Sequence, residues 1–201
     1  NGARNWFGYK GFSVQPSEFM KPVLILCLAS GFSNRPRFAR CLPTIAFAAL
    51  CCGVLLAEKD LGAVLLYFLT TVFMYYVATS NAFISLAGLG MGAGAAVIAY
   101  RALPYVQDRV AIWRNPWAVY DTFGYQIVHA LMAIASGGLF GVGLGLGNPT
   151  AIPVYESDFI FAVICEQFGL VFALCLLLIY VAMIWRGTTT AIAARSSFHG
   201  L

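Results

Sequence analysis

Charged residues are scarce in this chain of 201 residues: Asp, Glu, Lys and Arg make up 10% of it, whereas hydrophobic residues make up 61%. Soluble domains carry roughly 25% charged and 45–50% apolar residues, so the composition excludes a soluble globular protein. One helical crossing of a hydrocarbon core about 30 Å thick needs roughly 20 apolar residues. We therefore expect a polytopic membrane protein with about five spans.

Basic runs interleaved with aromatic residues are also missing, although 12 Lys and Arg exceed 8 Asp and Glu. This absence leads us to expect no nucleic-acid partner. The six cysteines have no metal-ligand spacing with His and lie in or beside apolar runs, so we interpret them as small buried hydrophobic residues. No leader with a cleavage site follows Asn1, which suggests an internal fragment of a longer protein.

Five apolar runs predict membrane-spanning helices, and the first is the weakest because it is short and opens with charge. The runs are Glu18–Phe32, Leu42–Ala57, Leu61–Thr79, Ala82–Tyr100 and Phe159–Trp185. We expect an all-α transmembrane helical bundle that forms a single domain over residues 1–201. Two overlapping GxxxG spacings, Gly88/Gly92 and Gly90/Gly94, predict the close approach of a neighbouring helix.

A long loop, residues 101–158, separates the last two spans, and a loop of this length without a soluble domain is usually functional. Its apolar middle, about Tyr125–Ala135, predicts an amphipathic helix that lies on or dips into the membrane. The positive-inside rule assigns the connections that carry Arg but no acid to the cytoplasm, and the long loop to the extracytoplasmic side. These arginines are Arg35, Arg37, Arg40, Arg186 and Arg195.

Two carboxylates accompany the start of the last span. Asp158 stands directly before Phe159, and Glu166 follows eight residues later, about two turns along roughly the same helix face. A helix N-cap would explain Asp158, but no cap explains Glu166 inside an apolar helix, where a carboxylate is costly. We therefore favour a functional role for the pair, because a carboxylate that is shielded from water at the start of a helix can act as a general base.

Charges near other helix ends have two interpretations each. Glu18 and Lys21 lie three residues apart and can pair on one helix face, either within a site or as an ion pair that reaches the membrane surface. Asp60 in the turn before Leu61, taken alone, is better explained as the cap of the third span. His129 is better explained by a polar contact than by a metal site, because no second ligand is near it in the sequence.

Three arginines of the long loop, with Lys21 and Lys59, can form a cationic outer patch suited to a lipid that carries pyrophosphate. Ordinary interfacial arginines are the competing interpretation; the three are Arg101, Arg109 and Arg114. Glycine alternates with other residues over 141–147 without completing a nucleotide-binding motif. A pliant hinge is the favoured interpretation of this stretch, and a loop whose amides approach phosphate is the alternative.

Five motifs in order resemble those of the FtsW/RodA/SpoVE (SEDS) family of bacterial cell-wall proteins, and together they cover nearly the whole chain. They are Gln15-Pro16-Ser17-Glu18 with Lys21, Asp60-Leu61-Gly62, Gly124-Tyr125-Gln126, Ser136-Gly137-Gly138-Leu139 with the following glycines, and Asp158-Phe159-Ile160-Phe161-Ala162 with Glu166 and Gly169. The resemblance implies an all-helical fold of about ten spans, of which this chain would supply the middle.

The resemblance further implies a peptidoglycan glycosyltransferase that polymerises lipid II on the outer face of the bacterial cytoplasmic membrane. Its implied partners are a class B penicillin-binding protein, which is a transpeptidase, and other divisome or elongasome membrane proteins. A flippase for the lipid-linked precursor and a non-catalytic scaffold for the transpeptidase are the alternatives. A lone fragment is expected to be inactive.

Carried over by position, Asp158 matches the essential aspartate of the family, Glu18 and Lys21 match its outer pair, and Asp60 matches another characteristic acid. Asp158 is then the expected base, and Lys21 with the three loop arginines is expected on the phosphate side, with Glu166 in support. No cofactor is assigned; a divalent cation is compatible with this chemistry, but the sequence has no dedicated ligand set. The chain departs from the family pattern at five positions: Lys59 stands where proline is usual, Asn115 where Asp is common, His129 in place of Gln, Val154 where Glu is frequent, and Gln167 in place of the second of two glutamates.

Overall fold

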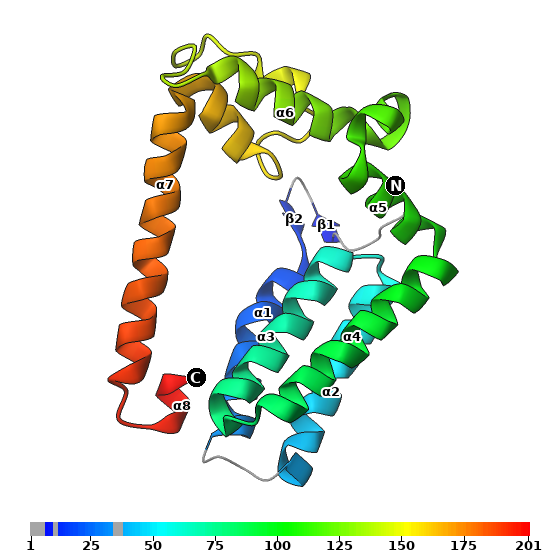
Figure 1. Cartoon of the computed structure of the whole chain (residues 1–201), viewed down its shortest axis with the longest axis vertical. Helices are drawn as coiled ribbons and strands as arrows, with labels where there is room; N and C mark the ends of the chain where they lie inside the picture. The colour runs from blue at the N-terminus through cyan, green and yellow to red at the C-terminus, as the bar shows by residue number, and fades with distance from the viewer. Residues whose placement is uncertain (1–6, 10–11, 34–37) are drawn as a thin grey trace. The chain divides into compact units, whose positions relative to one another are not determined.

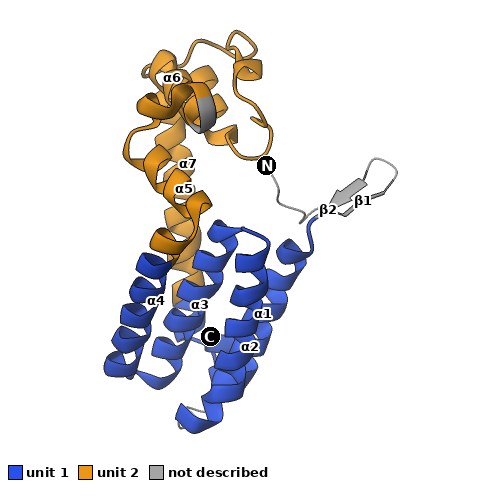
Figure 2. Ribbon diagram, turned by 90° about the vertical axis from the view of Figure 1, so that its right-hand side faces the viewer, with its two compact units in different colours: residues 1–98, 189–201 blue, residues 99–188 orange. Residues whose placement is uncertain are grey.

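The computed structural model describes residues 7–9, 12–33 and 38–201, and it is helical apart from one short hairpin (Figure 1). Strand β1 (Phe7–Tyr9) pairs antiparallel with β2 (Phe12–Val14), so that Tyr9 lies opposite Phe12. The chain divides into two compact units, residues 1–98 with 189–201 and residues 99–188, which are coloured separately in Figure 2. The all-α membrane bundle is confirmed, with the hairpin as an addition that the sequence did not suggest.

Four long helices belong wholly or largely to the first unit. They are α1 (Pro16–Phe32), α2 (Phe38–Ala57), α3 (Leu61–Thr79) and α4 (Ala82–Ala102), and the short α8 (Ser197–Gly200) packs against α1. Helices α1, α2 and α3 pack on one another around the fully buried Leu28, Phe32 and Tyr67. The ring of Phe32 meets that of Tyr75 edge to face, with centroids 5.7 Å apart, and this aromatic contact joins α1 to α3.

The glycines of α4 explain how it approaches α3. A Cβ added at Gly92 would lie 2.2 Å from the ring of Phe68, and one added at Gly88 would lie 3.8 Å from Val72. An added Cβ at Gly90 or Gly94 meets open space. The first GxxxG spacing therefore makes room for side chains of α3, whereas the second faces away from the described part of the unit.

The second unit contains the long loop and most of the last span. After α5 (Pro104–Arg114) come a 3-10 turn (Pro116–Val119), a π-helical turn (Tyr120–Gly124), α6 (Tyr125–Gly137) and a second 3-10 turn (Pro149–Ala151). Helix α7 (Ile160–Ile192) follows, with its last residues counted in the first unit. The predicted amphipathic helix of the loop is thus present as α6.

Four of the described helices are long and apolar enough to cross a membrane: α2, α3, α4 and α7. The first expected span corresponds to α1, which is not among these four because its 17 residues are fewer than one full crossing needs at 1.5 Å per residue. Large apolar side chains cover the outer faces of these helices, with Phe83 83% and Ile184 70% exposed. Such faces require hydrocarbon around them, so the chain is a multi-pass membrane protein.

The cysteines only partly follow the sequence interpretation. Cys41 and Cys165 are buried, but Cys27 and Cys175 are exposed on apolar helices. The expectation of burial is wrong for these two because an apolar run in a membrane helix places part of its residues against lipid rather than protein.

Candidate functional site

Asp158 lies in a turn that precedes α7. The backbone N–H of Asp158 and that of Ser157 both donate to the carbonyl of Val154, at 3.2 and 3.3 Å. The Ser157 hydroxyl donates to Oδ1 of Asp158 at 2.8 Å, and the Asp158 side chain is exposed. The carboxylate is therefore held by a residue of its own turn, and it does not cap α7, which begins at Ile160. It remains accessible to an incoming molecule.

Val154 makes this turn possible at a conformational cost. Its φ of 58° lies in the left-handed region, which a β-branched residue rarely adopts. The position is one of those at which the chain departs from the family pattern. The surrounding packing must therefore hold the turn in place.

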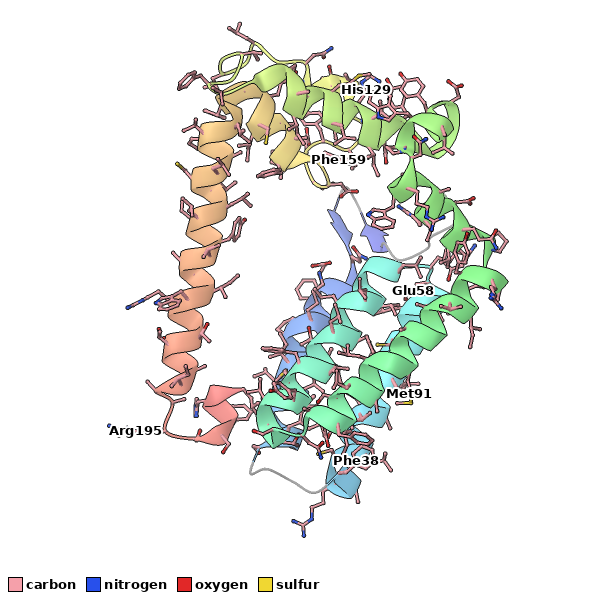
Figure 3. The ribbon with its side chains drawn as sticks, viewed as in Figure 1. Phe38, Glu58, Met91, His129, Phe159 and Arg195 are labelled. Atoms are coloured by element: carbon pink, nitrogen blue, oxygen red, sulfur yellow. The ribbon has the colours of Figure 1, made fainter. Side chains whose placement is uncertain are left out.

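An apolar anchor beside the turn supplies that packing. Ile152 is 1% exposed and lies in a cluster with Ala130 and Ala133 of α6 and Ala162 of α7. Tyr155 and Phe159, on either side of the aspartate turn, pack against the same cluster; Phe159 is labelled in Figure 3. The segment that carries Asp158 is thus fixed to both α6 and α7.

Glu166 lies beneath the glycine-rich loop rather than in the open. Its side chain is 8% exposed, and Oε1 accepts a hydrogen bond from the backbone N–H of Asn148 at 3.1 Å. Its Oε2 is buried without a hydrogen-bond partner among the described residues. A Cβ added at Gly147 would lie 2.7 Å from Oε2, so the glycine is needed for this close approach. The arrangement makes Glu166 a support of the loop.

Helix α7 is broken at Gly169, which has φ 80° and ψ 175°. Beyond the break, the N–H groups of Leu170 and Val171 donate to the carbonyls of Gly138 and Leu139 at 2.9 and 3.2 Å. Before the break, the carbonyls of Glu166 and Gln167 accept from the N–H groups of Val142 and Gly143 at 2.9 and 3.1 Å. Residues 138–147, which we call the glycine loop, thereby satisfy the backbone groups that a broken helix leaves without partners.

Two of the glycines are required by this exchange of hydrogen bonds. A Cβ at Gly141 would lie 2.2 Å from the carbonyl oxygen of Gln167, and one at Gly169 would lie 2.4 Å from the nitrogen of Gly141. Both residues also have positive φ. The stretch is therefore packed into the helix break, and its interpretation as a pliant hinge stays a prediction. The amides of Val142 and Gly143 are already used within the protein instead of being open to phosphate.

The three loop arginines lie on two consecutive helices, at positions that all belong to the second unit. Arg101 is in the last turn of α4, and Arg109 and Arg114 are on α5; all three side chains are exposed. The amide of Gln107 donates to the carbonyl of Tyr100 at 3.0 Å and ties α5 to the end of α4. The structure thus places the arginines in the same unit as Asp158 and Glu166.

Two departures from the family pattern have local explanations in the same unit. Asn115 accepts a hydrogen bond from the N–H of Ala118 at 3.3 Å, which is the capping role that an aspartate would also fill. His129 Nε2 lies 3.2 Å from the hydroxyl of Tyr120, and its ring centroid is 4.2 Å from that of Tyr125. The polar contact expected for His129 is therefore present.

Glu18 and Lys21 pair at the start of α1. Nζ of Lys21 lies 2.7 Å from both carboxylate oxygens of Glu18, with the side chains 33% and 56% exposed for Lys21 and Glu18 respectively. An exposed pair of this kind stabilises a fold by at most about 1 kcal/mol. The predicted pairing is confirmed, and its conformation leaves one side of each group open to solvent.

Asp60 both caps α3 and links it to α1. Oδ1 accepts from the N–H of Ala63 at 3.1 Å, and Oδ2 accepts from the side-chain amide of Gln15 at 3.2 Å. A second link joins the same two helices, because the buried hydroxyl of Tyr67 donates to the carbonyl of Ser17 at 2.9 Å. The sequence predicted no role for Gln15 beyond its place in a family motif, and it did not single out Tyr67. These bonds place Asp60 at the same end of the first unit as the Glu18–Lys21 pair.

The turn between α2 and α3 explains another departure. The N–H of Asp60 donates to the carbonyl of Leu55, and that of Lys59 donates to the carbonyl of Leu56, which is the Schellman arrangement of a helix C-terminus. Lys59 has φ 63°, a conformation that proline cannot adopt. A proline at this position would require a different turn.

No group of three or more His, Cys, Asp or Glu residues in the described ranges is arranged to hold a metal ion. Asp158 and Glu166 belong to one unit, whereas Glu18, Lys21 and Asp60 belong to the other, and each group is built within its own unit.

Comparisons with known proteins agree with these motifs. The FtsW/RodA/SpoVE family model, described as "Cell cycle protein", matches residues 1–201. The peptidoglycan glycosyltransferase RodA of Mycobacterium leprae is 38% identical over 98% of this chain and 46% of its own length. Stage V sporulation protein E of Bacillus subtilis is 33% identical over 96% of this chain and 55% of its own length. The chain thus spans about half the length of these relatives.

A solved structure is similar as well. It is described as "Structural coordination of polymerization and crosslinking by a peptidoglycan synthase complex", and one of its chains superposes with a TM-score of 0.69 at 29% identity. The match covers 99% of this chain and 56% of that chain. The similarity therefore extends over both compact units.

Proposed function

The chain belongs to the FtsW/RodA/SpoVE family, and from this premise we propose that it is the part of a peptidoglycan glycosyltransferase that carries the catalytic base. The observation that carries the proposal is the exposed carboxylate of Asp158 on a turn anchored by the buried Ile152. The name peptidoglycan glycosyltransferase, which the RodA relative bears, supports the assignment.

In the proposed reaction, Asp158 removes the proton from an acceptor sugar hydroxyl, which would otherwise keep that proton at neutral pH. The oxygen then bonds to the anomeric carbon of the donor sugar as the bond from that carbon to the lipid pyrophosphate breaks. The leaving pyrophosphate carries developing negative charge, which cations stabilise. Arg101, Arg109 and Arg114 belong to the same unit, and we assign these cationic side chains to the phosphate side.

Lys21 is the further cation of the proposed phosphate side, and Glu18 orients it. A long lysine side chain has several rotatable bonds, so an ion pair reduces its freedom before substrate binds. Asp60 acts indirectly, since its bonds to Ala63 and Gln15 fix the start of α1 beside the start of α3. Glu166 supports the loop that leads to Asp158.

We propose that the Asp158 side of the membrane is the outer face of the bacterial cytoplasmic membrane. Within the first unit, Arg40 lies in the first turn of α2, at the end opposite Glu58, and Figure 3 shows Phe38 and Glu58 at these two ends. The segment with Arg195 lies at the Phe38 end in the same view. Positive charge without acid at that end supports a cytoplasmic assignment; Arg35 and Arg37 lie outside the described residues.

The proposed substrate is lipid II, and the proposed partner is a class B penicillin-binding protein that crosslinks the product. The similar solved structure supports a partner because it is described as a complex that coordinates polymerization and crosslinking. A polyprenyl substrate reaches its enzyme from within the bilayer, which suits a site held by membrane-spanning helices rather than by a soluble domain.

The proposal is tested with the full-length protein and its transpeptidase partner in liposomes that contain fluorescent lipid II. We expect glycan polymer, resolved by gel electrophoresis, and a requirement for both proteins in the same vesicle. Movement of lipid II between leaflets without polymer would contradict the proposal and identify a transporter. A product made only by a second polymerase added to the vesicles would instead identify a scaffold.

A further inference from the structure

The glycine loop exposes several large apolar side chains although it belongs to a connection between spans. The exposed fraction is 82% for Phe140, 76% for Leu144 and 77% for Leu146, and Leu139 is 59% exposed. Contiguous exposed apolar surface marks a contact with a membrane, a ligand or another protein.

Charge is absent from the loop and from a wide margin around it. No Asp, Glu, Lys or Arg occurs over residues 122–155, a range that includes α6 and the whole glycine loop. A solvated loop of this length normally carries charge, because apolar segments do not remain extended in water. The composition therefore favours hydrocarbon around this part of the chain.

The length of α7 beyond its break sets the depth of the loop. The apolar stretch from Leu170 to Trp185 rises about 24 Å at 1.5 Å per residue, and Trp185 with Arg186 is typical of a membrane interface. The hydrocarbon core is about 30 Å thick, so about 6 Å of it extends past Leu170 toward the glycine loop. The bonds between this helix and Gly138 and Leu139 therefore lie at the edge of the hydrocarbon core.

Half of the backbone N–H groups of the loop are hydrogen-bonded within the protein. Irregular backbone is tolerated in hydrocarbon only where the protein satisfies its polar groups internally. Five of the ten N–H groups of the loop donate within the unit: Gly141 to Gly137, Val142 to Glu166, Gly143 to Gln167, Gly145 to the Gln167 side chain and Leu146 to Gly143. The adjoining Asn148 donates to the Glu166 side chain.

We propose that the glycine loop is a lipid-inserted element, and that Phe140, Leu144 and Leu146 contact the acyl chains of the leaflet at the α6 end of α7. The occupant is the bilayer itself because the loop continues the lipid-facing surface of α7, to which it is hydrogen-bonded. The loop thereby anchors the start of the Asp158 segment at the membrane surface, where a lipid-linked molecule presents its headgroup.

The test is spin labelling of the full-length protein in vesicles of phosphatidylethanolamine and phosphatidylglycerol, with native cysteines replaced. A label at Leu144 is compared with one at Glu156, an exposed charged residue of the same connection, and one at Leu178, which is 65% exposed on α7. The Leu178 label checks that the cysteine-free protein inserts into the bilayer. A label at Phe140 provides a second reading if the Leu144 variant fails to insert.

We expect the labels at Leu144 and Phe140 to collide with dissolved oxygen several-fold more often than with a water-soluble nickel chelate, as at Leu178. The label at Glu156 should show the opposite preference. A Leu144 label that behaves like Glu156 would overturn the proposal. Protection from both reagents would overturn it as well, because protein rather than lipid would then cover the loop.

Discussion

The carboxylate of Glu166 accepts a hydrogen bond at 3.1 Å from the backbone N–H of Asn148, which lies 18 residues earlier in the chain. This bond ties the residue that precedes the Asp158 segment to α7. The other anchors of the segment are apolar, with Ile152 buried against Ala133 and Ala162. The position and orientation of the exposed Asp158 thus depend on the carboxylate of Glu166, which is itself buried.

Replacing Glu166 with Ala is expected to loosen the loop base, because the Asn148 N–H loses its acceptor at a cost of about 1–3 kcal/mol. Hydrogen exchange followed by mass spectrometry should show faster exchange of peptides over residues 141–148. Glu166→Gln is the matched control, since its side-chain carbonyl can still accept the bond. Equal exchange in the two variants would show that the hydrogen bond does not hold the loop.

Gly141→Ala is expected to destabilise the protein more than Gly145→Ala. Both glycines have positive φ, at 81° and 76°, so both substitutions carry the backbone cost of about 1–2 kcal/mol. Only at Gly141 would the new Cβ also collide with the carbonyl oxygen of Gln167, whereas Gly145 has open space. Thermal unfolding in detergent should therefore place the Gly141 variant lower; equal midpoints would contradict the packing of the loop into the helix break.

Lys59→Pro should destabilise the turn between α2 and α3, because proline fixes φ near −65° and lacks the N–H that bonds to Leu56. Lys59→Gly can keep φ 63° without strain and serves as the control. We expect a loss of about 3 kcal/mol or more for the proline variant in unfolding measurements, and little change for the glycine variant. A fully stable proline variant would mean that the turn has the conformation usual in the family.

Exchange of Glu18 and Lys21 separates their interaction from their individual roles. Each single substitution, Glu18→Lys or Lys21→Glu, should lower polymer yield while changing unfolding stability by about 1 kcal/mol or less, because the pair is exposed. The double exchange restores opposite charges and should recover part of the lost activity. The acid would then lie later in α1, a less favourable order near a helix N-terminus, so recovery should be incomplete. No recovery would indicate that the pair does not act as a unit.

Much of the fold and part of the site could be predicted because charges and apolar runs are easily recognised in a membrane chain. Asp60 as the cap of α3, the Glu18–Lys21 pair and the contact of Gly88 and Gly92 with α3 all follow from spacing within one or two helices. Local geometry decides such features, so sequence patterns contain the necessary information.

The glycine loop shows what sequence periodicity could not supply. The apolar run from Phe159 to Trp185 gives no sign of a break at Gly169, since the break depends on Gly138 and Leu139 as alternative acceptors. The partner of Glu166, Asn148, is likewise distant in sequence and bonds through its backbone, which no side-chain pattern reveals. The contacts of Gln15 and Tyr67 could not be predicted for the same reason, because their partners lie 45 and 50 residues away.

The central claim is that Asp158 acts as the base of glycan polymerisation, and the most direct test is Asp158→Asn in the full-length protein with its partner and lipid II in liposomes. Glu156→Gln is the matched control, because Glu156 is another exposed carboxylate of the same segment. We expect the Asp158 variant to lose glycan synthesis by about 100-fold or more while the Glu156 variant stays near wild type. Long glycan strands made by Asp158→Asn at the wild-type rate would contradict the claim.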